Sequence, residues 1–449
     1  MPKIRAMEGG EGMTQVKLFP HQERALKATE GLQRVAYYLD MGLGKTFVGS
    51  EKAVTFQQKI LLVCQHSKIQ DWIEHFNDHY SLPVFNLTVK EQLAGFVAGD
   101  GQAVGVINYE LIFRRNALKQ MQDFTLMLDE SSLIQNETAK RSKFILSLKP
   151  SNVILLSGTP TDGKYERLWS QLHLLGWHIT KETFWQHYIE TEWIDTGDDS
   201  GFKRRIVTGY KNTDRLKAKM AQYGCVFMKS DEAFTLPQQQ EIPIMVPTSK
   251  EYRTFMYSHL ITVNVLDVAV TGWKTGILKE LVGDTSLTSR LYARQLCGMY
   301  SIAKLEAFRD LIESTNDRLI VFYNFTGELK AMLPIALQKT SHISFVNGST
   351  KDLQDYFLYE DSITFVQYQA GAMGLNLQKA NKIVYYTLPE KSEYLEQSKK
   401  RIHRIGQEKT CFYYYLLCRN SVELDILENL KMRKDYTDEL FKKKYQPQG

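Results

Sequence analysis

One short segment constrains the fold of this chain more than any other. The residues Asp40-Met-Gly-Leu-Gly-Lys-Thr46 follow an apolar run, Val35 to Leu39, and precede a stretch from Phe47 to Thr55 that we predict to be helical. Glycines in a strand-to-helix turn let backbone N–H groups approach phosphate oxygens at the N-terminus of the helix. Lys45 adds a positive charge, and the Thr46 hydroxyl can ligate magnesium. The predicted nucleotide-binding residues of this loop are Met41, Gly42, Leu43, Gly44, Lys45 and Thr46.

An acidic segment further along the chain supports a nucleotide site. By itself the loop is ambiguous, because Leu39 stands where the full GxxxxGK[ST] pattern has its first glycine. However, Leu126-Met-Leu-Asp-Glu130 ends a predicted strand with two adjacent carboxylates. Asp129 would hold Mg²⁺ and Glu130 would orient and deprotonate the attacking water, since phosphoryl transfer depends on positioning and charge neutralisation. An isolated acidic pair is commonly a solvent-exposed turn, but its order after the loop favours catalysis.

Short β-branched and aliphatic runs alternate with helical stretches in both halves of the chain. Strands separated by helices form right-handed βαβ units, which give parallel sheets covered on both faces. We therefore predict an α/β fold with two parallel sheets flanked by helices. The predicted strands are Val35–Leu39, Ile60–Cys64, Val104–Ile107, Thr125–Leu128 and Val153–Leu156, then Leu319–Tyr323, Ile343–Val346, Ile363–Gln367, Ile383–Tyr386 and Phe412–Leu417.

The segments between these strands suggest the domain boundaries. A polar run with two prolines, Leu236 to Pro243, is the predicted linker, which places one domain at residues 1–236 and the other at 237–449. Each domain carries a predicted helical insertion, at about residues 179–233 in the first and about 249–300 in the second. Within the first insertion, Thr196 to Gly201 has the composition of a loop. The lysine-rich segment from Lys431 to Lys444 is predicted to be a solvated helix or tail.

Composition narrows the class of protein without deciding it. The formal net charge of +5 permits a nucleic-acid partner but does not require one. The first twelve residues lack the apolar block of an export signal, and no apolar run approaches the roughly 20 residues of a bilayer span, so we expect a cytoplasmic protein without a membrane partner. The cysteines form no CxxC pair, which argues against a zinc site or a disulfide framework and favours buried thiols at Cys64, Cys225, Cys297, Cys411 and Cys418.

These segments occur in an order that resembles the Snf2 family of superfamily 2 helicase-like proteins, over about residues 16–430. Asp40 to Thr46 resembles its first motif. Similar blocks in the first half are Leu18-Phe-Pro-His-Gln22 (Q motif), Ile60 to Gln65 with Asp71-Trp-Ile-Glu-His-Phe76 (motif Ia), Val106 to Leu111 (motif Ib), Ser157-Gly-Thr-Pro160 (motif III) and Arg167 to Leu175, a helical block typical of Snf2 proteins. The resemblance implies that Gln22 reads the adenine edge and that motif III couples the ATP site to the nucleic-acid site.

The second half carries the most family-specific block. Ile320 to Thr326 and Gln369 to Leu377 resemble motifs IV and V, and Gln397-Ser-Lys-Lys-Arg-Ile-His-Arg-Ile-Gly-Gln407 resembles motif VI. Arg401 and Arg404 lie three positions apart, on one face if the segment is helical, and would supply charge to the γ-phosphate as arginine fingers. The resemblance also implies a catalytic role for Gln397 and nucleotide binding at Gly374. Surface salt bridges remain the alternative for a basic segment, and we favour that alternative for Lys399, Lys400 and Lys409.

Two positions depart from the family pattern. Ser132 occupies the place of the histidine in a DEAH-like box, so coupling from that position to motif III is open. Ala372 and Met373 replace the usual motif V residues, which we interpret as tolerated packing. The residues expected to contact nucleic-acid phosphates are Gly158, Thr159, Thr326, Gly348, Ser349, Thr350 and Gly371. The tryptophans Trp72, Trp169, Trp177 and Trp185 are expected in the core, and Trp273 is a possible loop contact.

The resemblance implies two RecA-like P-loop domains with Snf2-type helical insertions. With ATP and Mg²⁺, such a protein would translocate along double-stranded DNA without sequence preference and remodel protein–DNA complexes or branched DNA. We expect a monomeric, minimal motor of bacterial or phage type. The alternatives are a strand-separating helicase or the motor subunit of a restriction system, and an inactive nucleic-acid-binding scaffold, against which Lys45, Glu130 and Arg404 argue.

Overall fold

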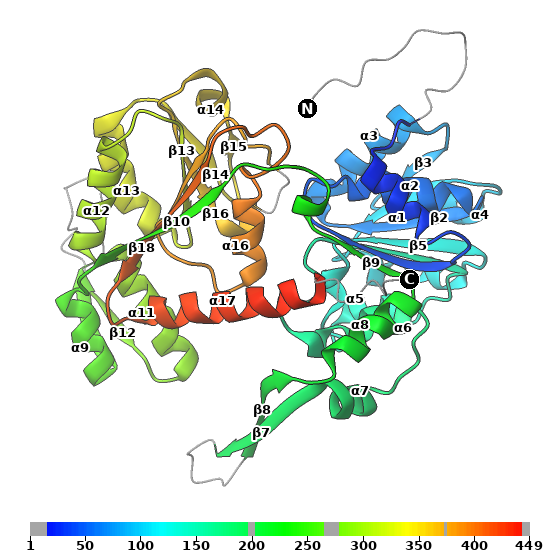
Figure 1. Cartoon of the computed structure of the whole chain (residues 1–449), viewed down its shortest axis with the longest axis horizontal. Coiled ribbons are helices and arrows are strands. Elements are labelled where there is room, and N and C mark those ends of the chain that lie inside the picture. Colours follow the sequence, from blue (N-terminus) through cyan, green and yellow to red (C-terminus); the bar gives the residue numbers. More distant parts are fainter. Residues whose placement is uncertain (1–15, 196–202, 265–277, 372–374, 442–449) are drawn as a thin grey trace, which may run out of the picture. The chain divides into compact units, whose positions relative to one another are not determined.

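The computed structural model describes residues 16–195, 203–264, 278–371 and 375–441 (Figure 1). The chain divides into two compact units, one formed by residues 1–233 with 436–449 and the other by residues 234–435. Each unit is built on its own seven-stranded sheet. None of the helices in the described ranges is long and apolar enough to cross a membrane.

The first unit contains a sheet with strand order β3-β4-β2-β5-β6-β1-β9, in which every neighbouring pair is parallel. The five predicted strands are confirmed, and they bury nearly all of their side chains, as a sheet covered on both faces requires. The strands are β1 (Arg34–Leu39), β2 (Lys59–Cys64), β3 (Val84–Asn86), β4 (Val104–Asn108), β5 (Phe124–Asp129), β6 (Asn152–Ser157) and β9 (Cys225–Met228).

Helices cover this sheet. Helix α2 packs so closely that a Cβ at Gly49 would lie 2.8 Å from the Leu156 side chain of β6, so a larger residue would force this helix–sheet contact to shift. The helices are α1 (Pro20–Lys27), α2 (Lys45–Thr55), α3 (Ile69–His79), α4 (Lys90–Ala98), α5 (Lys140–Leu146), α6 (Trp169–Leu174), α7 (Lys181–Tyr188) and α8 (Thr213–Gln222). The short 3-10 helices are η1 (His66–Lys68), η2 (Ile112–Arg114), η3 (Asn116–Gln120), η4 (Ser131–Ile134), η5 (Tyr165–Arg167) and η6 (Ser230–Glu232).

The first insertion is only partly helical, so the prediction of a helical segment over 179–233 is wrong in part. Between α7 and α8 lies an antiparallel hairpin, β7 (Ile189–Asp195) and β8 (Lys203–Tyr210), which projects from the unit (Figure 1). After α8, β9 joins the edge of the main sheet. The sequence Ile189-Glu-Thr-Glu-Trp-Ile alternates with the period of a strand, a signal that outweighs the polar character of the segment. The loop predicted at Thr196 to Gly201 lies outside the described residues.

The second unit contains a sheet with strand order β10-β18-β17-β13-β16-β14-β15. All neighbouring pairs are parallel except β14 and β15. The predicted strands are again confirmed, with β13 fully buried at the centre. The strands are β10 (Gln239–Val246), β13 (Leu319–Tyr323), β14 (Ile343–Val346), β15 (Lys351–Asp352), β16 (Ile363–Gln367), β17 (Lys382–Tyr385) and β18 (Cys411–Cys418).

The predicted linker, Leu236 to Pro243, is wrong over its second half. Strand β10 begins at Gln239 and runs parallel to β18, with Pro243 in register with Tyr415. Because β10 is the edge strand, an imino nitrogen without a hydrogen does not break the ladder if it faces outward. Pro243 therefore lies in an edge strand rather than in a linker, while Pro237 precedes that strand.

The second insertion is also mixed. A two-stranded antiparallel sheet, β11 (Leu260–Asn264) and β12 (Leu278–Val282), lies between α9 (Lys250–Ser258) and α11 (Ser286–Met299), which corrects the helical prediction over 249–300. Trp273 lies outside the described residues. The remaining helices are α12 (Ile302–Glu313), α13 (Thr326–Lys339), α14 (Gln354–Leu358), α15 (Tyr368–Gly371), α16 (Ser392–Lys399) and α17 (Val422–Phe441), the last of which contains most of the predicted lysine-rich helix.

Candidate nucleotide site and helicase motifs

The turn from β1 to α2 has the geometry of a phosphate loop. Gly42 and Gly44 have φ angles of 87° and 72°, in the left-handed region that glycine occupies without strain. Gly44 is the N-cap of α2, and within the described residues no side chain caps this helix. The N-terminus of α2 and its dipole thus face the loop, which suits an anionic ligand.

Two side chains of α1 contact backbone carbonyls of the loop. The Gln22 amide accepts a hydrogen bond from Phe19 N (2.8 Å) and donates to Leu43 O (3.3 Å) and Gly44 O (3.4 Å). His21 Nε2 lies 3.0 Å from Leu43 O. A Cβ at Gly44 would lie 2.1 Å from Gln22 Nε2, so a larger residue would displace this amide as well as strain the left-handed backbone at Gly44. The adenine role predicted for Gln22 would use the same amide, and adenine would have to compete with these loop contacts.

Lys45 lies where the loop meets the end of β6. Its ammonium donates to Leu39 O (2.9 Å) and Asp40 O (3.3 Å), and a Cβ at Gly158 would lie 3.4 Å from Nζ. Gly158, predicted to contact nucleic acid, is therefore adjacent to the predicted ATP lysine. The loop glycines, the helix terminus and this cation form a donor set that fits a triphosphate.

Asp129, the predicted magnesium ligand, ends β5 and is held by residues of motifs Ia and Ib for which the sequence predicted no such contact. Trp72 Nε1 of α3 donates to Asp129 Oδ2 at 2.8 Å, and the Tyr109 hydroxyl donates to Asp129 O at 2.8 Å. Burial raises the pKa of the Asp129 carboxyl above its usual value. The Trp72 hydrogen bond and the Lys45 charge lower the pKa but offset the effect of burial only in part. Trp72 is buried as predicted, yet it also has a polar contact with the site. A carboxylate and a hydroxyl, at Asp129 and Thr46, suit Mg²⁺, which prefers oxygen ligands.

Glu130, the predicted catalytic base, has an unusual backbone conformation. Its φ angle is 55°, in the left-handed region, at the start of η4. Ser157 Oγ donates to Glu130 Oε2 at 3.3 Å and accepts from Thr159 N at 3.1 Å. The backbone amide of Thr159, another predicted nucleic-acid residue, is thus used to order motif III beside Glu130. Ser132, which replaces the DEAH histidine, is buried.

Motif VI in the second unit is helical only from Gln397 to Lys399, which corrects the premise for Arg401 and Arg404. Helix α16 ends at Lys399, and both arginines follow in turns. Arg401 is 3% exposed, with Nη1 3.5 Å from Leu375 O, while Arg404 is half-buried and burial lowers its pKa. Gln397 donates to Glu393 Oε1 one turn earlier in α16. Residues 372–374 lie outside the described residues. They include Gly374, predicted to bind nucleotide, and the two residues predicted to have a packing role.

Lys399 differs from its predicted surface role. The side chain is buried, and Nζ donates to Glu241 Oε1 of β10 at 2.7 Å, which joins α16 to the edge strand. The salt bridge favoured for this residue is thus present, but its position on the surface is wrong.

The remaining nucleic-acid candidates lie at loop ends of the second unit. Ser349 N and Thr350 N donate to Asn347 Oδ1 at 3.0 and 2.9 Å, which orders the turn around Gly348. A Cβ at Gly348 would have no atom within 4 Å, so the turn is open at this point. Thr326 begins α13 and Gly371 ends α15. Phosphate binding at these positions stays a prediction.

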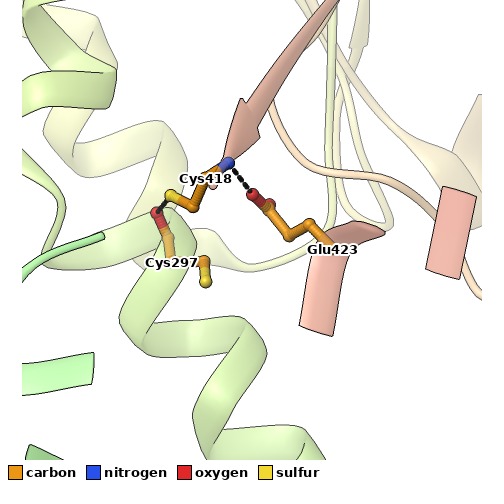
Figure 2. A group of neighbouring side chains, drawn as sticks. All are labelled: Cys297, Cys418 and Glu423. Carbon is orange, nitrogen blue, oxygen red and sulfur yellow. Dashed lines mark hydrogen bonds between the residues drawn. The ribbon is translucent and has the colours of Figure 1, made fainter. Parts of the chain in front are cut away.

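Two thiols and a carboxylate gather away from these motifs (Figure 2). All five cysteines are buried, as predicted, and none forms a disulfide. Ligand atoms of Cys297, Cys418 and Glu423 lie within 4.8 Å of one another, but Lys304 Nζ is 2.6 and 2.7 Å from the two Glu423 oxygens. Cys418 N also donates to Glu423 Oε2. A buried ammonium that already neutralises the carboxylate would repel a metal cation, so we assign a hydrogen-bonded ion pair rather than a metal centre.

A glycine loop after the first strand, a lysine at the start of the next helix and an acidic pair on a parallel strand define a P-loop nucleotide-binding protein. The chain belongs to the Snf2-related family of helicase-like ATPases: the SNF2-related domain matches residues 28–300, and the helicase conserved C-terminal domain matches residues 303–406. This confirms the family resemblance that the motifs indicated.

Known relatives span several kingdoms. The SWI/SNF-related matrix-associated actin-dependent regulator of chromatin subfamily A member 1 of Mus musculus is 25% identical, over 74% of this chain and 33% of its own length. The putative ATP-dependent helicase/translocase YwqA of Bacillus subtilis is 25% identical, over 70% of this chain and 35% of its own length. The chain therefore spans about a third of these relatives. The Sulfolobus solfataricus SWI2/SNF2 ATPase core in complex with dsDNA is 19% identical, covering 94% of this chain and 93% of that one, with a TM-score of 0.42.

Proposed function

We propose that this chain is an ATP-dependent motor that translocates along double-stranded DNA and remodels bound protein or branched DNA. The proposal rests on one observation. Lys45, Asp129, Glu130 and the loop that begins at Ser157 lie together at the carboxyl ends of β1, β5 and β6. Ligands of open α/β sheets bind at this edge. The match to both domains of the Snf2-related family supports the same reaction.

Each proposed catalytic or nucleotide-binding residue has a role that follows from its chemistry. The amides of the Gly42–Gly44 turn and the Lys45 ammonium would bind the β- and γ-phosphates. Mg²⁺, bound by Thr46 and Asp129, would neutralise charge on the phosphate oxygens. Glu130 would accept a proton from the attacking water, with its carboxylate oriented by Ser157 at 3.3 Å. Arg404 would add charge to the γ-phosphate in the transition state.

The proposed DNA partner rests on family membership and on charge. The chain carries a net charge of +5, and contacts to backbone phosphates read no bases, so binding without sequence preference is expected. We propose that DNA engages both units and favours the state in which Arg404 acts on the nucleotide held by the first unit. Stimulation of hydrolysis by DNA follows if DNA binds that state more tightly.

The deciding experiment measures phosphate release with single-stranded, duplex and forked DNA and with RNA, together with triplex displacement. We expect stimulation by duplex DNA, displacement of the third strand and little separation of a forked duplex. Lys45→Ala should abolish hydrolysis and leave nucleotide-free DNA binding largely intact. Efficient fork separation would favour a helicase instead, and an absence of turnover with every nucleic acid would leave the binding scaffold.

A further inference from the structure

Gln171 is a fully buried polar side chain in the short helix α6. It lies on α6 within the run Leu168-Trp-Ser-Gln-Leu-His-Leu-Leu175 and is 0% exposed, with buried leucines on either side. Burying an amide is unfavourable unless its donor and acceptor atoms are hydrogen-bonded. The partners of Gln171 therefore explain why the residue is tolerated there.

Those partners lie in strand β1, in the turn of the DEAH-like box (motif II) and in motif III. Gln171 Oε1 accepts from the Ser131 hydroxyl at 2.8 Å and from the Tyr38 hydroxyl at 3.0 Å. Gln171 Nε2 donates to Pro160 O, the last residue of motif III, at 2.7 Å. Two hydroxyl donors on one side and a carbonyl acceptor on the other fix the orientation of the amide.

These contacts close a ring through the proposed catalytic base. Ser157 Oγ bonds the Glu130 carboxylate, Pro160 lies three residues further along the same loop, and Gln171 connects Pro160 to Ser131, the neighbour of Glu130. Glu130 needs such support because its φ of 55° is unfavourable for a residue with a side chain. The ring thus holds the strained turn through Ser131, and it holds the Glu130 carboxylate through Ser157.

We propose that Gln171 is a positioning residue for ATP hydrolysis, which fixes Glu130 by joining the motif II turn to motif III. The inference rests on the proposed ATPase function. It also supplies a connection between these motifs in a chain where Ser132 replaces the histidine of the DEAH-like box.

The test is Gln171→Leu, which keeps the size of the side chain and opens the ring. Tyr38→Phe is the matched control, because it removes a buried hydrogen bond to the same Oε1 but leaves the ring closed. In Gln171→Leu we expect kcat at saturating DNA to fall by about 10- to 100-fold, the scale of a misplacement near 1 Å, while KM for ATP changes little. The kcat of Tyr38→Phe should stay within about twofold of the wild-type value. Its loss of thermal stability should be similar to that of Gln171→Leu.

Ser131→Ala keeps the proposal falsifiable if Gln171→Leu does not fold. It should lower kcat in the same direction, and the double variant should be no slower than Gln171→Leu alone, because both changes break one ring. Amide hydrogen exchange of residues 129–135 should accelerate in both ring variants and not in Tyr38→Phe. Unchanged exchange, or equal kcat losses in Tyr38→Phe and Gln171→Leu, would overturn the proposal. A wild-type chain without turnover would refute the ATPase function, while the exchange measurement still tests the ring.

Discussion

Single residues of the site are held by hydrogen bonds from elements distant in the sequence. Asp129 is an example, because its Oδ2 accepts a hydrogen bond from the Trp72 indole N–H at 2.8 Å. Trp72 stacks on Phe76 in a buried position, so the ring has a packing role and a polar role together. The two roles can be separated by changing only the donor.

Trp72→Phe should keep the packing and weaken the magnesium site. Partners that orient a metal ligand typically contribute about 10- to 100-fold to metal affinity, so we expect the half-saturating Mg²⁺ concentration for hydrolysis to rise by about tenfold or more. The affinity for a fluorescent ADP analogue should fall in Mg²⁺ and not in EDTA. Trp169→Phe is the control, because its indole donates over the same 2.8 Å to a carbonyl, Ile179 O. Equal Mg²⁺ dependence in the two variants would contradict this role.

Glu328 offers a second test at this scale, through pH. Burial raises the pKa of its carboxyl to about 7, against the backbone donors Asn324 N and Phe325 N, which lower it. Between about 4.5 and about 7 the folded protein keeps a proton that the unfolded chain has lost, so the free energy of unfolding falls as pH rises through this window.

Glu328→Gln removes this titration. The difference in unfolding free energy between the variant and the wild type should shift by about 2–3 kcal/mol in favour of the variant from pH 5 to pH 8, since one pKa unit corresponds to about 1.4 kcal/mol. Denaturant titrations at several pH values measure the difference. Glu313→Gln, at the exposed end of α12, is the control for loss of a charge. Parallel pH profiles for wild type and Glu328→Gln would contradict the shift.

At the scale of elements, a buried ion pair joins α12 to α17. Lys304 and Glu423 are 0% and 3% exposed in their side chains, and Glu423 also binds Cys418 N at the end of β18. Burial lowers the pKa of Lys304, but the charge of Glu423 and its hydrogen bond, together with the neighbouring Cys418 and Cys297, outweigh burial and raise it, so the ammonium form is favoured. The pair thus ties two helices to the end of a strand.

Lys304→Met should destabilise the second unit by about 3–5 kcal/mol, because it leaves a buried carboxylate without its counter-charge. Adding Glu423→Gln should recover part of this loss, since the charge itself is then absent. Calorimetry of the full chain resolves the unfolding of the second unit. A double variant that is less stable than Lys304→Met would contradict the explanation by charge.

At the scale of the whole molecule, the proposed reaction draws on both units. Lys45, Asp129 and Glu130 belong to the first, and Arg404 belongs to the second. Arg404→Ala should therefore cut DNA-stimulated hydrolysis by about 10³-fold or more, the scale of an arginine finger, with a much smaller change in ATP affinity. Arg404→Lys should not restore the rate, because an ammonium lacks the planar fork of guanidinium.

The measurement is single-turnover hydrolysis beside equilibrium nucleotide binding. Lys409→Ala is the control, because Lys409 is an exposed cation five positions further along the same segment. A rate near that of the wild type in Arg404→Ala would show that the second unit supplies no such group.

The sequence alone determined the parallel strands, the phosphate loop and the family. Each depends on a few consecutive residues: apolar β-branched runs set the strands, and glycine between Asp40 and Lys45 sets the loop. Tertiary structure alone decided that Trp72 reaches Asp129, that Gln171 joins Ser131 to Pro160, and that β9 and β10 complete the sheet edges. These outcomes depend on which distant surfaces pack together, and a buried polar side chain shows its role only when its partner is in place.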